Sequence, residues 1–198
     1  MSILLKGADW HLYTRGADAT LVSLNQANPG SDTRLHVSNI ACSFDDTDHK
    51  ELELYGMSKV GPFDATDTGV VNLTNDTFTV AGHGLSNGNK VVYDNGGGTS
   101  IGSITSGTAY WVVGVAGSVF QLSATLGGAA INLTGTQANF GTAQLVIPQS
   151  KGWMVYDQVA LTYMYPLPMA YGCPAYLQVT PGAGIQALVH MEGFSGGR

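Results

Sequence analysis

The sequence predicts an all-β protein: a jelly-roll-like β-sandwich host domain that carries an inserted small β-barrel or β-sandwich domain. Runs rich in β-branched and aromatic residues alternate with Gly, Asn and Pro turns, most regularly from Phe78 to Leu133. No segment of ten or more residues shows a persuasive 3.6-residue apolar period. Charged residues become rare within 65–147 and return on both sides. We therefore expect a discontinuous host, 1–64 with 148–198, and an insert at 65–147.

The N-terminal flank is expected to supply two strands, at 34–44 and 51–57. Alternation along the first of them places Leu35 and Val37 on one strand face and Ile40 and Cys42 on the other. The first thirty residues hold few clear strand signals, so they are interpreted as an extended arm or as a first strand and loop. The acidic run 45–51 lacks the Gly that an EF-hand loop needs, and a solvated turn is the better interpretation.

The insert is expected to contain seven short strands separated by turns. Asn87-Gly88 and the run Asn95 to Gly98 supply residues that tolerate the positive φ of tight turns. The predicted strands lie near 70–73, 77–81, 90–94, 109–115, 118–123, 130–133 and 143–147. These lengths suit a small antiparallel unit.

The C-terminal flank returns to the host domain after Pro148. Residues 153–165 form the longest β-prone run of the chain, and 175–180 and 185–192 follow as strands. The last six residues, GFSGGR, are expected to be a frayed end. For a sandwich to close, strands before residue 64 must pair with strands after residue 148.

Composition favours a component of an assembly. Charged residues make up 11% of the chain, against about 25% in ordinary globular proteins. A sparsely charged surface is buried against neighbours with little cost of charge desolvation. The net charge of −6 and the absence of a basic run argue against nucleic-acid binding. No signal peptide and no eighteen-residue apolar run are visible, so neither secretion nor a membrane span is expected.

No catalytic, metal-binding or cofactor motif stands out. The five histidines show no metal-ligand spacing, and His83, which precedes a turn glycine, is expected to cap or stack. No nucleophile elbow or phosphate loop is present, so we expect a protein that is not an enzyme and uses no cofactor. Cys42 and Cys173 lie in different flanks. They can pair if the flanks meet, but synthesis in a cytoplasm favours free thiols.

Aromatic residues and Met provide two candidate surfaces. Those of the C-terminal flank cannot all face one side of a strand, so part of this set is predicted to be buried by another subunit. This candidate interface comprises Trp153, Tyr156, Tyr163, Met164, Tyr165, Met169 and Tyr171. In the insert, Tyr93 and Trp111 are candidates for a glycan-stacking platform, for which core packing is the competing interpretation.

The insert resembles a module of tailed-phage structural proteins. That module has a His-Gly-Leu turn, a Val-Tyr strand, a Gly-rich stretch ending in Tyr, a strand ending in Gln-Leu, and a late Leu-Thr-Gly. The matching residues are His83-Gly84-Leu85, Gly88, Val92-Tyr93, Ile104 to Tyr110, Phe120-Gln121-Leu122 and Leu133-Thr134-Gly135. The likeness covers about a third of the chain, and Ile104 stands where the pattern more often has Leu.

The flanks resemble, more loosely, phage head-decoration or cement proteins. The similar stretches are Leu54-Tyr55-Gly56, Val60 to Asp64, and Tyr165 to Pro168. The resemblance implies a non-enzymatic virion protein, made in the bacterial cytoplasm and placed on the capsid surface. Its implied partners are the major capsid protein and copies of itself, as a homotrimer. The alternative is a tail, fibre or baseplate component whose insert recognises a host-surface glycan.

Overall fold

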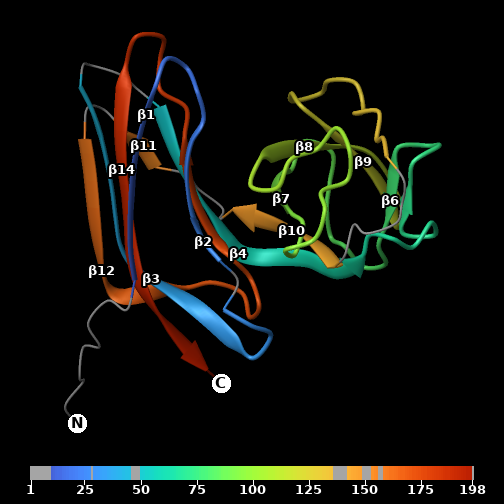
Figure 1. Ribbon diagram of the computed structural model, residues 1–198, viewed down its shortest axis with the longest axis horizontal. Coiled ribbons are helices and arrows are strands. Elements are labelled where there is room, and N and C mark those ends of the chain that lie inside the picture. The colour runs from blue at the N-terminus through green and yellow to red at the C-terminus, as the bar shows by residue number, and fades with distance from the viewer. Residues whose placement is uncertain are drawn as a thin grey trace. The chain divides into compact units, whose positions relative to one another are not determined.

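The computed structural model describes residues 10–27, 29–45, 50–135, 142–148, 153–155 and 158–197. Within these ranges it contains fourteen β-strands and no helix, which confirms the predicted all-β class (Figure 1). The chain divides into two compact units. The sandwich unit comprises Met1–Ser58 and Pro148–Arg198, and the insert unit comprises Lys59–Ile147.

The two seams between the units were predicted with different success. The second seam lies at Ile147/Pro148, as expected, but the first lies at Ser58/Lys59 rather than after Asp64. The strand predicted at 51–57 was expected to end before the Gly-Pro step at 61–62. Instead β4 (Lys50–Asp64) continues through it, and Val60 and Phe63 pack in the core of the insert unit.

The sandwich unit consists of two sheets (Figure 1). The first, which we call the four-stranded sheet, has the order β1 (Trp10–Ala17), β14 (Gln186–Gly197), β3 (Thr33–Phe44) and β12 (Gln158–Pro168). The second contains β2 (Val22–Gln26), β13 (Ala175–Val179), the first part of β4, and β11 (Trp153–Val155) paired with β4. Strands from before residue 64 thus pair with strands from after residue 148, as a closed sandwich requires.

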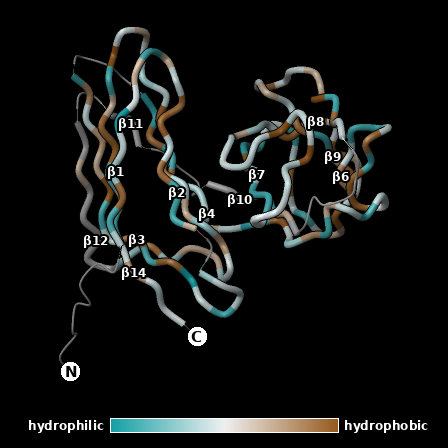
Figure 2. The backbone as a smooth tube through the Cα atoms, viewed as in Figure 1, coloured by the Kyte–Doolittle hydropathy of each residue, from teal (hydrophilic) through white to brown (hydrophobic). Residues whose placement is uncertain are grey.

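One apolar core lies inside the sandwich unit, and both sheets contribute to it. Figure 2 shows hydrophobic residues recurring along these strands. The four-stranded sheet supplies Leu35, Val37, Ile40, Val189 and Met191, among others, all of them buried. The second sheet supplies alternate apolar residues of β4, β13 and β2. Burial alternates along β14 of the four-stranded sheet, as in a sheet with one face in water, whereas every residue of β13 in the second sheet is buried.

The predicted face assignment of β3 is wrong, and a β-bulge is the reason. Leu35 and Val37 are buried, but so are Ile40 and Cys42, which strict alternation would place on the opposite face. The ladder with β14 shifts register between Val37 and Asn39, leaving Ser38 as an extra residue. An extra residue in one strand of an antiparallel pair reverses the alternation beyond it.

Both ends of the sandwich unit are more regular than expected. The segment interpreted as an arm or as one strand and a loop contains β1 and β2, which pair with β14 and β13 respectively. The predicted frayed end, GFSGGR, instead continues β14 as far as Gly197, paired with β3. Chain ends that are hydrogen-bonded into a sheet are ordered by it.

The insert unit contains the rest of the ten-stranded sheet to which β2, β13 and β4 belong, and its antiparallel strands curve around a core of their own (Figure 1). Its strand order is the second part of β4, β10 (Thr142–Pro148), β7 (Lys90–Asp94), β8 (Ala109–Ala116), β9 (Val119–Ser123), β6 (Thr77–Thr79) and β5 (Val71–Asn72). Six of the seven predicted strands are present. The seventh, 130–133, is not a strand, although the Ile131 N–H donates to the Leu122 carbonyl of β9.

The residues of the phage-module pattern form turns and core contacts of the insert unit. The Thr105 N–H donates to the Tyr110 hydroxyl at 2.8 Å, and the Gly107 N–H donates to the Tyr93 carbonyl at 2.8 Å. His83 Nδ1 accepts the Leu85 N–H at 2.9 Å, which leaves Nε2 to donate to the Gly117 carbonyl at 3.0 Å. The expected capping role of His83 is confirmed.

Cys42 and Cys173 are both buried thiols, and no disulfide joins them. Burial raises the pKa of the Cys42 thiol to about 11, so the reactive thiolate is scarce at neutral pH. We expect a thiol reagent at neutral pH to label neither cysteine in the native protein and both after denaturation without a reductant. Fewer than two labelled thiols after denaturation would show a disulfide, and rapid labelling of the native chain would contradict the burial.

Candidate functional site

The outward face of the four-stranded sheet, which we call the outer face, gathers the most distinctive exposed side chains of the sandwich unit. Alternate residues of β1 point away from the core: His11, Tyr13 and Arg15. The paired strand β14 contributes Glu192 opposite His11 and His190 opposite Tyr13. Tyr13 is 79% exposed, and Leu188, opposite Arg15, is 41% exposed. Few apolar side chains of this size are so exposed in the described chain.

Beyond β14, the outward residues of β3 between its bulge and Phe44 are small and uncharged: Asn39, Ala41 and Ser43. In the register of the sheet, Glu192 is followed by Asn39 of β3, and His190 by Ala41. Ala160 of β12, which is exposed, lies opposite Ala41. Small uncharged side chains lose little hydration when they are covered. Next to the histidine-rich side at β1 and β14, β3 thus presents small residues between its bulge and Phe44.

One end of the outer face contains an open depression of about 200 Å³. Arg15, Leu188, Gln186 and Asp45 are among its lining residues. The Gln186 N–H donates to the Asp45 carboxylate at 2.8 Å, and the Asp45 N–H donates to the Gln186 carbonyl at 3.2 Å. These bonds hold the chain leaving β3 against the start of β14. The depression is a shape into which a projecting side chain of a neighbour can fit.

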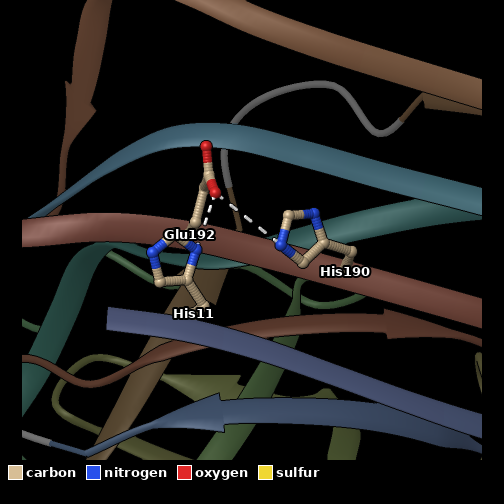
Figure 3. A group of neighbouring side chains, drawn as sticks. All are labelled: His11, His190 and Glu192. Carbon is tan, nitrogen blue, oxygen red and sulfur yellow. Dashed lines mark ion pairs between the residues drawn. The ribbon is translucent and has the colours of Figure 1, made fainter. Parts of the chain in front are cut away.

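His11, His190 and Glu192 form a compact cluster on this face (Figure 3). His11 Nδ1 lies 2.8 Å from Glu192 Oε2, and His190 Nε2 lies 3.8 Å from the same oxygen. The two imidazole rings are nearly parallel, with centroids 6.5 Å apart. Figure 3 shows a nitrogen of each ring directed toward the carboxylate between them.

The residues predicted as a subunit interface are separated by the fold. Trp153 lies on β11, and Tyr163, Met164 and Tyr165 lie on β12, an end strand of the four-stranded sheet. The side chains of these four and all of Tyr156 lie outside the described part of the structure, so the prediction stays a prediction for them.

Met169 and Tyr171 have described side chains, and Met169 corrects the prediction. Met169 is 1% exposed and packs in the core of the sandwich unit, so it offers no surface to a partner. Tyr171 is half-buried, with the Arg34 guanidinium carbon 4.9 Å from its ring centroid. The apolar run beyond β12 thus turns inward at Met169, which its composition alone did not indicate.

The predicted glycan platform of Tyr93 and Trp111 is not formed. Tyr93 is 0% exposed, and its hydroxyl accepts the Ile101 N–H at 3.3 Å inside the insert unit. The last four residues of β7 are all buried, so this strand has no wet face on which Tyr93 can be displayed. Trp111 is half-buried, and the Lys90 ammonium lies 5.4 Å from its ring centroid. The competing interpretation of Tyr93, core packing, is confirmed.

Sequence reasoning missed the histidine cluster because its members come from opposite ends of the chain. His11 lies in a segment that was not assigned to a strand, and His190 and Glu192 lie in the last strand. Alternation in HLYTR and LVHME places His11, Tyr13 and Arg15 on one face, and Leu188, His190 and Glu192 on one face. Pairing these two segments is the step that would have found the cluster.

Comparison with known proteins does not identify this chain. The described part of the chain contains no helix that is long and apolar enough to cross a membrane. No protein-family model, no curated protein and no solved structure matches the chain significantly.

Proposed function

We propose that this protein is a non-enzymatic virion protein of a tailed phage that decorates the capsid surface. In this role it binds the major capsid protein, associates with copies of itself as a homotrimer, and stabilises the head shell. The observation that carries the proposal is the outer face, where Tyr13 and Leu188 are exposed and the small uncharged residues Asn39, Ala41 and Ser43 follow on β3. The phage-module pattern of the insert unit supports the same assignment.

The outer face has the chemistry of a contact surface. Interface centres are enriched in aromatic side chains and depleted in charge. Tyr13 offers a large amphipathic ring, and Leu188 offers an apolar side chain beside the depression. Asn39, Ala41 and Ser43 continue the surface without charge. We assign this face to the contact with the capsid lattice.

The contact between copies is assigned to β12. Among the described strands, β12 ends the four-stranded sheet and pairs only with β3. An end strand presents unpaired backbone groups to which another chain can bind. The predicted interface residues Tyr163, Met164 and Tyr165 lie on this strand. In a trimer, β12 of each copy would bind a different surface of the next copy, because only such a head-to-tail contact closes into a three-membered ring.

Because a trimer is symmetric, weak individual contacts are sufficient for it to bind the capsid lattice. A trimer that meets three equivalent places on a lattice binds with an effective concentration set by its own geometry, so its overall affinity exceeds that of one contact by about 10²–10⁴. Each outer face therefore needs only modest affinity. Stabilisation of the shell follows from bridging neighbouring capsomers, with no bond made or broken.

The test uses heads of the encoding phage assembled without this protein. We expect the full chain to sediment with such heads. The double variant Tyr13→Asp/Leu188→Asp should bind them at least tenfold more weakly, because each substitution places an unpaired charge in the contact. Leu126→Asp is the matched control: Leu126 is a 65% exposed leucine of the insert unit. Equal binding by the double variant would exclude the outer face, and no binding by the unchanged chain would contradict the proposed function.

A further inference from the structure

We propose that His11, His190 and Glu192 bind one divalent transition-metal ion, with Zn²⁺ as the representative ion. Each residue offers one ligand atom, and the three atoms lie within 4.8 Å of one another. Both histidines direct a nitrogen toward the same region beside Glu192 (Figure 3). This inference concerns the chain itself and holds whether or not the protein is found on a phage head.

The separations of the two histidine nitrogens from the Glu192 oxygen are close to what a tetrahedral ion requires. Zn²⁺ binds His nitrogen and carboxylate oxygen at about 2.0–2.2 Å, which sets ligand atoms about 3.4 Å apart. The His11 nitrogen lies 2.8 Å from the Glu192 oxygen, and the His190 nitrogen lies 3.8 Å from it. The first distance must lengthen and the second shorten by about half an ångström, and the two histidine nitrogens, which lie within 4.8 Å, must approach each other by up to about 1.4 Å. Rotation of side chains at a surface supplies such shifts without moving the backbone.

The backbone that holds the three residues is regular. His11 lies directly opposite Glu192 in the antiparallel ladder of β1 and β14, and His190 lies two residues away from Glu192 on the same strand face. Strand β14 is paired on its other side with β3, where Glu192 lies opposite Asn39. A strand paired on both sides positions its side chains more firmly than a loop does.

The ligand set selects the class of ion. Two imidazole nitrogens and one carboxylate oxygen suit Zn²⁺, Ni²⁺ or Cu²⁺, whereas Ca²⁺ and Mg²⁺ prefer sites made of oxygen. Three protein ligands leave the remaining coordination position to water. The competing interpretation is a plain surface ion pair between Glu192 and a protonated histidine, which contributes little energy. The two interpretations differ in whether an ion saturates the site.

The experiment titrates the untagged full-length chain, freed of metal, with Zn²⁺ in a calorimeter. We expect one Zn²⁺ per chain, and at least tenfold weaker binding for His190→Ala and for Glu192→Gln, because loss of even a supporting partner costs about 10–100-fold in metal affinity. His36→Gln is the matched control: His36 lies on the same sheet but stacks on Phe194, with ring centroids 4.8 Å apart. Ca²⁺ should give no saturable binding.

A second measurement keeps the test independent of folding. Co²⁺ bound to the unchanged protein and to His36→Gln should give the visible absorption typical of nitrogen ligands. This absorption should be absent in His11→Gln. The His11 side chain is exposed, and circular dichroism checks that this variant is folded. Absence of saturable Zn²⁺ binding by the unchanged chain would overturn the proposal. Full-strength binding by a folded His11→Gln/His190→Ala double variant would overturn it as well.

Discussion

Phe120→Ala is expected to lower the free energy of unfolding of the insert unit by about 3–5 kcal/mol, because a large buried ring is replaced by a cavity. Phe120 is 0% exposed, and its ring stacks on Phe78 at 5.4 Å between centroids and lies 5.0 Å from the His83 ring. Denaturant unfolding followed by amide NMR signals of each unit would measure the change. Few single substitutions in a domain of this size cost more.

The matched control for this substitution is Leu126→Ala. Leu126 belongs to the same unit but is 65% exposed, so its removal should change the free energy of unfolding by less than about 0.5 kcal/mol. Because the sandwich unit has its own core, its signals should shift little in Phe120→Ala. Equal effects of the two substitutions would show that Phe120 does not pack as described.

Gly193→Ala is expected to destabilise the sandwich unit by about 1–3 kcal/mol or more, as overpacking of a filled site does. A methyl group at this position would overlap the backbone carbonyl oxygen of His36, which cannot rotate away. The Trp10 ring closes the other side. Thermal unfolding of the full-length chain would register the loss as a lower melting temperature of the sandwich unit.

Gly197→Ala serves as the control on the same strand. No atom lies within 4 Å of the position that its added methyl group would take. We expect Gly197→Ala to unfold at the same temperature as the unchanged protein. If both variants lowered the melting temperature equally, strand propensity would explain the destabilisation, and the close approach to His36 would not. Gly193 also adjoins Glu192, so the affinity for Zn²⁺ should fall together with the stability.

The sequence predicted those strands whose bounds are set by neighbouring residues, such as a β-branched run that ends at a turn. The strand predicted at 90–94 has the bounds of β7, because a β-branched run ends at Gly-rich turn residues. The pairing of the two flanks followed from the need to close a sandwich. The bulge at Ser38 was not predictable from alternation, because alternation assumes that every residue is paired in step.

The candidate site was largely beyond sequence reasoning for a related reason. A motif is visible in a sequence when its residues have a fixed spacing, whereas His11 and Glu192 meet only through the β1–β14 ladder. Burial is also set by tertiary packing: Met169 was assigned to a subunit interface but packs in a core, whereas for Tyr93 core packing was already one of the two interpretations.

The position of the protein on intact phage particles tests the central claim most directly. Cryo-electron microscopy of particles carrying the unchanged chain should show trimeric density on the outside of the head, repeated at local three-fold positions, with the outer face of each copy against the capsid lattice. Density confined to the tail or baseplate, or particles that lack the protein, would contradict the account.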